Sequence, residues 1–319
     1  MPSLKEYGHA IFMFTISSVG MMMTNKLAVS AFPLPCSLVF IQNIATLAIL
    51  SLFARQISGI NKQVLINWIP IALLFSVMLF TSLKSFVYVN VSTVVIMRNI
   101  GSIITTVVEY VVRGEKVNTE IVLSELAIAG GAYLYGYQNA SLNWIGFFWV
   151  MINVIAQVAY GVTLKHYMAS KTHFASMTKY TMSLLNNALC LPCILFLILV
   201  QEFGSLGSNV MKVDFMGFFW IALTCVIGFL ISTSGFGLQK LVSATTFLVV
   251  NNLVKFFNIF LGFVFLGDQM GLYDGIGCFV ALSAGAWYSS AIYNFQQAAS
   301  HHSEVRVKTV VKETENDAP

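Results

Sequence analysis

The sequence predicts an all-α integral membrane protein of ten transmembrane helices, built from two inverted five-helix repeats with both termini in the cytosol. Three observations predict this fold class: the composition, the spacing of the apolar runs and an internal repeat. Of the 319 residues, 57% are hydrophobic and only 9% are charged, whereas soluble proteins average about 25% charged residues. The basic residues are scattered through short loops rather than clustered, so nucleic-acid binding is not predicted.

Ten apolar runs are long enough to cross a bilayer, which takes about 20 helical residues. They extend roughly over 7–31, 33–54, 66–88, 92–113, 119–137, 143–168, 176–201, 213–238, 242–266 and 271–294. The connections are short and leave no room for a soluble catalytic domain. We expect the first repeat over residues 1–137 and the second over 138–295. The polar residues 296–319 are predicted to form a disordered cytosolic tail.

The basic residues between the spans set the orientation. With both termini in the cytosol, twelve of them are cytosolic and one, Lys212, lies on the far side of the membrane. This distribution agrees with the positive-inside rule. Adding or removing one helix in the first half would destroy the alternation.

A weak internal repeat relates the fourth span to the ninth. Val91–Val117 aligns without a gap with Ala244–Met270, and Arg98-Asn99 then meets Asn251-Asn252. Because five is an odd number, two such halves must cross the membrane in opposite orientations. Inverted repeats are typical of secondary transporters, which bind substrate near the midplane between the halves. The similar composition of all apolar helices is the alternative explanation of the match.

The ninth span carries polar residues where the bilayer would penalise them. Asn251, Asn252 and Lys255 lie in its first half, and a charge at the centre of a membrane helix costs roughly 2.5 kcal/mol or more. Asn251 and Lys255 are four residues apart and share a helix face. Because of this cost, we expect this face to line a wet cavity. An ammonium group flanked by amides suits a phosphate together with a hydroxylated or heterocyclic group.

Other polar residues in the spans have structural as well as functional explanations. Asn186 and Asn187 point about 100° apart on a helix, so one can face a cavity while the other bonds a neighbouring helix. Interhelical hydrogen bonding alone would also explain both. The sequence contains no catalytic constellation, no intramembrane metal cluster and no G-x-x-x-x-G-K-[ST] motif for ATP. We therefore expect neither an enzyme nor a cofactor.

On these residues the chain resembles the nucleotide-sugar transporters of the drug/metabolite transporter superfamily, and most of all the Golgi GDP-mannose transporters. The resemblance covers nearly the whole chain. The family motifs are T-N-K, T-S-x-K, a basic-Asn pair followed by Glu, F-Y-N-N and G-A-L-N-K. They are matched here by Thr24-Asn25-Lys26, Thr81-Ser82-Leu83-Lys84, Arg98-Asn99 with Glu109, Leu184-Leu185-Asn186-Asn187 and Asn251-Asn252-Leu253-Val254-Lys255.

The resemblance also implies which residues meet the substrate. In the family, the seventh-span asparagines and a Ser/Thr cluster at the start of the ninth span help to hold the nucleotide, and the G-A-L-N-K helix faces the sugar and phosphates. With the neighbouring polar and aromatic positions, the candidate substrate-binding residues are Phe14, Arg98, Asn99, Asn186, Asn187, Ser243, Thr245, Thr246, Asn251, Asn252 and Lys255.

Several positions depart from the family pattern. Phe14, Leu185 and Phe247 lack the hydroxyl of the aromatic residues found there, Asn251 replaces the Gly of G-A-L-N-K and Val254 replaces its Asn. An asparagine in place of glycine fills space where the family lets a sugar approach the backbone. The resemblance therefore leaves the identity of the sugar, and less strongly that of the base, open.

The resemblance implies a nucleotide-sugar antiporter that moves a GDP-sugar, GDP-mannose first of all, from the cytosol into the Golgi or ER lumen in exchange for the nucleoside monophosphate. The alternatives are a UDP-sugar antiporter of the same fold, an exchanger of another phosphorylated metabolite such as a sugar phosphate, and a non-transporting scaffold. We expect no transit peptide, which argues against a plastid-type exchanger. The expected partner is the lipid bilayer, and Gly271-x-x-x-Gly275 leaves a homodimer open.

Overall fold

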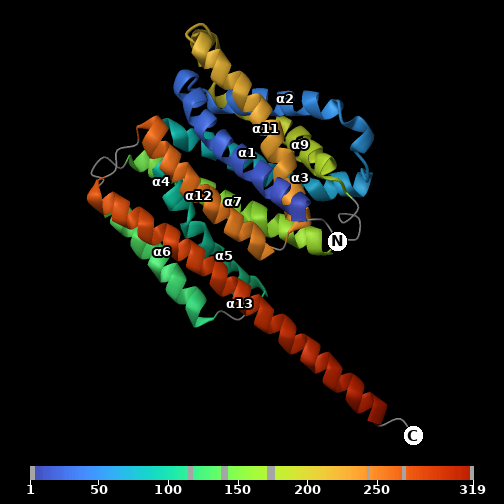
Figure 1. Ribbon diagram of the computed structural model, residues 1–319. Coiled ribbons are helices and arrows are strands. Elements are labelled where there is room, and N and C mark those ends of the chain that lie inside the picture. Colours follow the sequence, from blue (N-terminus) through green and yellow to red (C-terminus); the bar gives the residue numbers. More distant parts are fainter. Residues whose placement is uncertain are drawn as a thin grey trace.

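The computed structural model describes residues 4–113, 118–137, 143–170, 177–242, 244–267 and 271–316, and these segments contain helices but no strand. The helices form a single bundle (Figure 1). The elements are α1 (Leu4–Ala31), α2 (Pro35–Ser51), the 3-10 turn η1 (Ala54–Gln56), α3 (Lys62–Tyr88), α4 (Val91–Arg98), α5 (Ile100–Arg113), α6 (Thr119–Tyr137), α7 (Trp144–Ser170), α9 (Lys179–Gln201), α10 (Phe203–Val210), α11 (Phe215–Leu241), α12 (Ala244–Leu266) and α13 (Leu272–Asn316).

Each of the ten predicted spans coincides with one long helix, except that the fourth is divided at Asn99 into α4 and α5. Within the described residues, seven helical segments are long and apolar enough to cross a membrane, and α2 is an apolar helix of 17 residues. The chain is therefore a multi-pass membrane protein in its helical content. Ten crossings and the cytosolic position of both termini stay predictions.

The polar C-terminal segment differs from its prediction. We expected residues 296–319 to be disordered, but α13 continues as one helix to Asn316. Figure 1 shows its end projecting away from the bundle. Two physical reasons favour this outcome: the segment is rich in good helix formers such as Ala, Gln, Glu, Lys and Arg, and it extends an existing helix without a new nucleation step.

Side-chain caps mark where several helices begin. Asn61, Thr178 and Asp214 precede α3, α9 and α11, and each accepts the backbone N–H three residues later, at 2.7, 3.1 and 2.7 Å respectively. Such caps satisfy donors that a helix start leaves without partners. The polar residue that ends each loop therefore also fixes the first turn of the following helix.

Two ionisable residues, the buried Glu202 and the half-buried Lys26, cap helices other than their own. The carboxylate of Glu202 accepts the backbone N–H of Cys36 at 2.7 Å and that of Ser37 at 2.8 Å, at the start of α2. The Lys26 ammonium donates to the carbonyl oxygens of Phe86 and Val89 at the end of α3, at 2.7 and 2.9 Å. Both contacts place charge where the helix dipole favours it.

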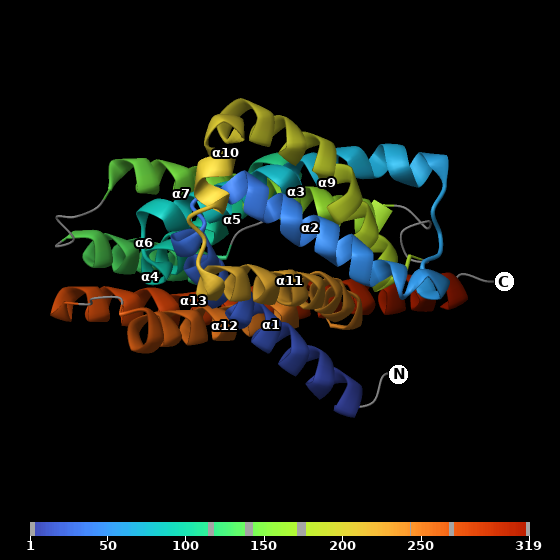
Figure 2. The ribbon, with the colours of Figure 1, turned by 90° about the horizontal axis from the view of Figure 1, so that it is seen from above.

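Helix pairing relates the two halves of the chain. Counted as spans, α1 to α6 supply the first five and α7 to α13 the last five. The first span, α1, packs extensively on α11 (the eighth), and its counterpart α7 (the sixth) packs equally extensively on α3 (the third). The fifth and tenth spans, α6 and α13, pack on each other, as do α2 and α9. Exchanging each span with its counterpart leaves these pairings unchanged, as expected for two related repeats. Figure 2 shows α11, α12 and α13 along one side of the bundle, and α3, α7 and α9 along the other.

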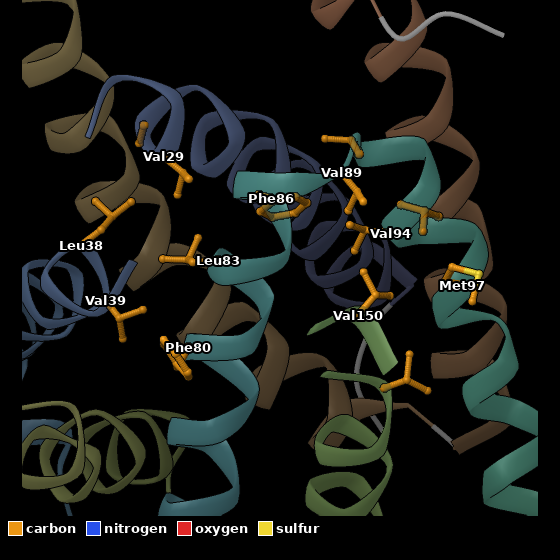
Figure 3. Close-up of a cluster of buried hydrophobic side chains, with 14 of the residues drawn as sticks. Val29, Leu38, Val39, Phe80, Leu83, Phe86, Val89, Val94, Met97 and Val150 are labelled. Atoms are coloured by element: carbon orange, nitrogen blue, oxygen red, sulfur yellow. The ribbon is translucent and has the colours of Figure 1, made fainter. Parts of the chain in front are cut away.

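The main hydrophobic core lies at one end of the bundle. Figure 3 shows members of this cluster on both sides of α3, with Val29 of α1 and Leu38 of α2 on one side of Phe86 and Val94 of α4 and Val150 of α7 on the other. Many large apolar side chains on the outside of the helices are exposed, whereas most polar side chains within the bundle are hydrogen-bonded. This distribution suits a lipid environment, where polar groups must be satisfied internally.

The helices α6 and α13 approach closely enough to exclude side chains between them. A Cβ on Gly131 of α6 would lie 2.5 Å from the backbone nitrogen of Ala281, and one on Gly277 of α13 would collide with the backbone of Tyr135. Small residues allow such close backbone contact between membrane helices. These two glycines therefore fix the distance between the last helices of the two halves.

Candidate functional site

Helix α12 and the α4–α5 junction meet at a charged hydrogen bond. Lys255, in the middle of α12, donates from Nζ to Oδ1 of Asn99 at 2.7 Å. Asn99 lies at the junction of α4 and α5 and is only 2% exposed. Because an ammonium group can only donate, the amide oxygen of Asn99 must face Lys255. Its Nδ2 is then a buried donor, and it has no hydrogen-bond partner among the residues that the structure describes.

Arg98 adds a second cation beside Asn99. Its Nε donates to Oδ1 of Asn153 on α7 at 3.0 Å, and its Nη2 donates to Oγ of Ser82 on α3 at 2.7 Å. Arg98 and Lys255 are both half-buried, and Lys255 bonds to Asn99, the residue that follows Arg98 in the chain. Within the described residues, both cations bond only to neutral groups. Two half-buried cations without a carboxylate are unfavourable for an empty bundle and favourable for an anionic ligand.

The backbone is locally distorted at this cluster. The N–H of Asn99 bonds to the carbonyl of Ile96 at 3.0 Å, and the N–H of Ser102 bonds to the carbonyl of Asn99 at 3.1 Å. Both bonds span three residues, as in a 3-10 turn, rather than the four of an α-helix. A mid-helix stretch of this kind often marks a functional position. It divides the predicted fourth span into α4 and α5.

The α9 asparagines form a separate polar cluster. Asn186, which is fully buried, accepts from Nε1 of Trp68 on α3 at 2.7 Å and donates to the hydroxyl of Tyr160 on α7 at 2.8 Å. Asn187 donates to the carbonyl of Ser183 at 2.7 Å and to Oγ of Ser232 on α11 at 3.1 Å. These bonds join α9 to three other helices, so the asparagines pack the bundle. Their contact with a nucleotide stays a prediction.

The α12 asparagines point to different partners. Asn251 donates to the carbonyl of Phe247, one turn earlier in its own helix, at 3.0 Å. Asn252 donates to the carbonyl of Gly285 at 2.6 Å and to Oγ of Ser289 at 2.7 Å, both on α13. Asn252 therefore holds α12 against α13, and none of these hydrogen bonds reaches Asn99.

The aromatic position on α1 packs against the start of α12. The rings of Phe14 and Phe247 lie 5.4 Å apart between centroids, in a tilted arrangement, and Phe14 is buried. Thr246 is exposed. Ser243 and the side chain of Thr245 lie outside the residues that the structure describes, so their predicted contacts are not placed.

Of the eleven predicted site residues, the structure thus brings Arg98, Asn99 and Lys255 into one cluster. The others lie in separate contacts or outside the described residues. Sequence reasoning missed Asn153, the fully buried residue that binds Arg98. Its signal was present: it is an isolated amide in the apolar run W-V-M-I-N-V-I-A, and polar residues inside membrane helices are costly unless they have partners.

Comparisons with known proteins place the chain in a family. The model of the Triose-phosphate Transporter family matches residues 6–289. The chain is 26% identical over 292 residues to the GDP-mannose transporter GONST2 of Arabidopsis thaliana, covering 87% of this chain and 77% of the relative. It is 27% identical over 306 residues to the GDP-mannose transporter 2 of Vanderwaltozyma polyspora, covering 88% and 91%.

Two further comparisons extend this result. The chain is 24% identical over 282 residues to the GDP-fucose transporter 1 of Arabidopsis thaliana, covering 84% of this chain and 81% of the relative. One solved crystal structure superposes with a TM-score of 0.55 at 14% identity, covering 90% of this chain and 96% of the other. At that identity the superposition shows a shared fold alone.

Proposed function

The chain belongs to the Triose-phosphate Transporter family, and from this premise we propose that it is a nucleotide-sugar antiporter of the Golgi membrane. It carries a GDP-sugar, GDP-mannose first of all, from the cytosol into the lumen and returns the nucleoside monophosphate. Members of this family are transporters, not enzymes. The names of the GDP-mannose and GDP-fucose transporters to which the chain is similar support this substrate class.

The observation that carries the proposal is the cluster of Arg98, Asn99 and Lys255. Its two cations are bonded to neutral groups, and Nδ2 of Asn99 is buried without an acceptor. Phosphate oxygens are anionic acceptors, and they form charge-assisted hydrogen bonds to ammonium and guanidinium groups. A ligand with a diphosphate would therefore satisfy all three donors at once.

The position of the cluster suits an exchange mechanism. It lies where α12 of one half meets the α4–α5 junction of the other, and the exchange symmetry of the helix pairs supports two inverted repeats. In such transporters, the halves move around a substrate held between them. Exchange follows when the loaded carrier changes state faster than the empty one. A single copy of the chain suffices for this scheme, and the homodimer stays a prediction.

A second candidate is an exchanger of a smaller phosphorylated metabolite, such as a sugar phosphate. The description of the matching family favours it, and the cationic cluster would bind any phosphate. The curated relatives favour the nucleotide sugar instead. A UDP-sugar antiporter of the same fold differs only in the base, which the cluster does not contact.

The exchange assay uses the purified full chain in liposomes preloaded with GMP, UMP, inorganic phosphate or buffer alone. We expect GMP inside to stimulate uptake of labelled GDP-mannose strongly, and UMP and phosphate to have little effect. Stimulation of UDP-sugar uptake by UMP would replace the GDP-sugar with a UDP-sugar. Stimulation of triose-phosphate uptake by phosphate alone would favour the sugar-phosphate exchanger. No stimulation by any preload would refute exchange.

A further inference from the structure

We propose that Asn153 of α7 is a positioning residue for Arg98: it fixes one edge of the guanidinium, so that the remaining donors of Arg98 and Nδ2 of Asn99 hold a phosphate oxygen of the transported anion. The inference deepens the proposed function and rests on it in one respect, that the transported anion occupies this cluster.

The amide of Asn153 is held in one orientation. Its Nδ2 donates to the carbonyl of Met78 at 2.8 Å and to Oγ1 of Thr81 at 3.1 Å, both on α3. Its Oδ1 accepts from Nε of Arg98 at 3.0 Å. A backbone carbonyl can only accept and a guanidinium can only donate, so exchanging the amide oxygen and nitrogen would break two of the three bonds. Asn153 is also fully buried, which leaves water no access to replace them.

These bonds leave part of the Arg98 guanidinium available to a ligand. A guanidinium has five N–H donors, and here one on Nε bonds to Asn153 while one on Nη2 bonds to Ser82. No hydrogen bond from Nη1 is found within the described residues. The paired N–H groups of Nη1 and Nη2 match the spacing of two oxygens on a phosphate. Asn153 and Ser82 therefore hold one edge while the other edge keeps its donors.

Asn99 supplies an independent observation that points to the same ligand. It follows Arg98 directly in the chain, and its Nδ2 is buried without a partner. The bond from Lys255 fixes the amide, so Nδ2 cannot be exchanged for an oxygen. A buried donor without an acceptor is unfavourable until a ligand supplies one. The missing group is an acceptor beside two cations, which describes a phosphate oxygen.

The neutrality of the positioning groups is part of the inference. A carboxylate at residue 153 could accept from the guanidinium as the amide does, but it would cancel the charge and could not donate to the carbonyl of Met78. The amide of Asn153 and the hydroxyl of Ser82 orient the fork and leave its charge to the ligand. In the site without anion, the positive charge of Arg98 remains beside Asn99, whose amide oxygen binds the second cation, Lys255.

The test measures binding to the purified full chain carrying Asn153→Ala, Arg98→Ala or both. The ligands are GDP-mannose, GMP, glyceraldehyde phosphate, inorganic phosphate and the neutral guanosine. We expect Asn153→Ala to weaken binding of the phosphorylated ligands roughly tenfold and to leave guanosine unchanged. In the Arg98→Ala background, the same change should cause no further loss. Asn43→Ala, which removes a buried amide bonded to Cys190 on α9, is the matched control and should retain wild-type affinities.

The positioning role would be overturned if Asn153→Ala lowered the affinity for guanosine as much as that for the phosphorylated ligands. It would also be overturned if Asn153→Ala caused the same loss of affinity in the wild-type and Arg98→Ala backgrounds. If Asn153→Ala does not fold, Ser82→Ala tests the other bond to the same edge, and unchanged phosphate affinity there would overturn the proposal. If only phosphate or glyceraldehyde phosphate binds, and the Arg98-dependent loss persists, the proposed function fails and the positioning role stands. If GDP-mannose binds all variants equally, the positioning role fails alone. If no ligand binds, both fail.

Discussion

The α4–α5 region and α12 are paired by the sequence alignment of the two halves, yet they use their polar residues differently. The alignment of the halves pairs Arg98 with Asn251 and Asn99 with Asn252. In the α4–α5 region the positively charged residue is Arg98 itself. In α12 it is Lys255, one helical turn after the position that aligns with Arg98. The helix is interrupted at Asn99, whereas α12 is continuous from Ala244 to Leu266.

The two equivalent asparagines show what this difference means. Asn99 contacts the other half through Lys255 and keeps a donor without a partner, while Asn252 uses its donors to hold α13. Polar residues at aligned positions can therefore have different roles, because the neighbours of each residue decide whether it packs helices or faces a ligand. The comparison predicts large binding effects at Lys255 and Asn99, and stability effects at Asn252.

The largest expected effect is that of Lys255→Ala. Hydrogen bonds to charged groups contribute about 1.5–3 kcal/mol, so we expect uptake of the phosphorylated substrate to fall by roughly 10- to 150-fold. The control is the equivalent position on α5: Ser102 bonds only to the carbonyl of Asn99, so Ser102→Ala should transport nearly normally. Both are measured as initial uptake rates in liposomes, with monodispersity as the check on folding. Normal transport by Lys255→Ala would remove this residue from the site.

The next effect separates Asn252 from Asn99. Asn252→Ala leaves the buried carbonyl of Gly285 and Oγ of Ser289 without this donor, so we expect a loss of about 1–3 kcal/mol in stability and unchanged ligand affinity of the folded protein. Asn99→Ala should show the reverse pattern. Thermal unfolding and ligand titration of both variants test this contrast. Similar profiles for the two variants would mean that the repeats do not divide these roles.

The smallest effect is expected for Asn251→Gly, which restores the glycine of the family motif. The amide of Asn251 bonds only within α12, and a glycine inside a helix costs roughly 0.5–1 kcal/mol compared with alanine. We therefore expect slightly lower stability and the same ratio of GDP-mannose to GDP-fucose uptake. A changed ratio would assign Asn251 a part in sugar selection, as the resemblance to the family implied.

The sequence was sufficient to locate the helices, and it named the two cations that the structure places beside Asn99. Apolar runs locate spans because the bilayer demands them, and the third predicted span, 66–88, ends where α3 ends. Lys255 was identified by the cost of burying its charge, and Arg98 by the resemblance to the family. The break at Asn99 was not predictable, because it depends on backbone bonds within one turn.

The hydrogen-bond partners of the buried amides were not predictable from the sequence either. Asn153 and Arg98 are far apart in the chain, and only the packing of α7 beside α3 and α4 brings them together. The contacts of Asn186 with Trp68 and Tyr160 also depend on three helices at once. Periodicity describes the face of one helix, whereas such sites require the relative rotation of several.

A small change where α6 and α13 cross closely would move a distant part of the chain. A side chain at Gly277 must tilt or displace α13, because the backbone of Tyr135 lies in the way. The helix continues to Asn316, which at 1.5 Å per residue places its end about 58 Å from the crossing. A tilt of only about 5° at the glycine would therefore move that end by about 5 Å. The displacement caused by a single added methyl group inside the bundle can thus be larger at the far end of α13 than at the crossing.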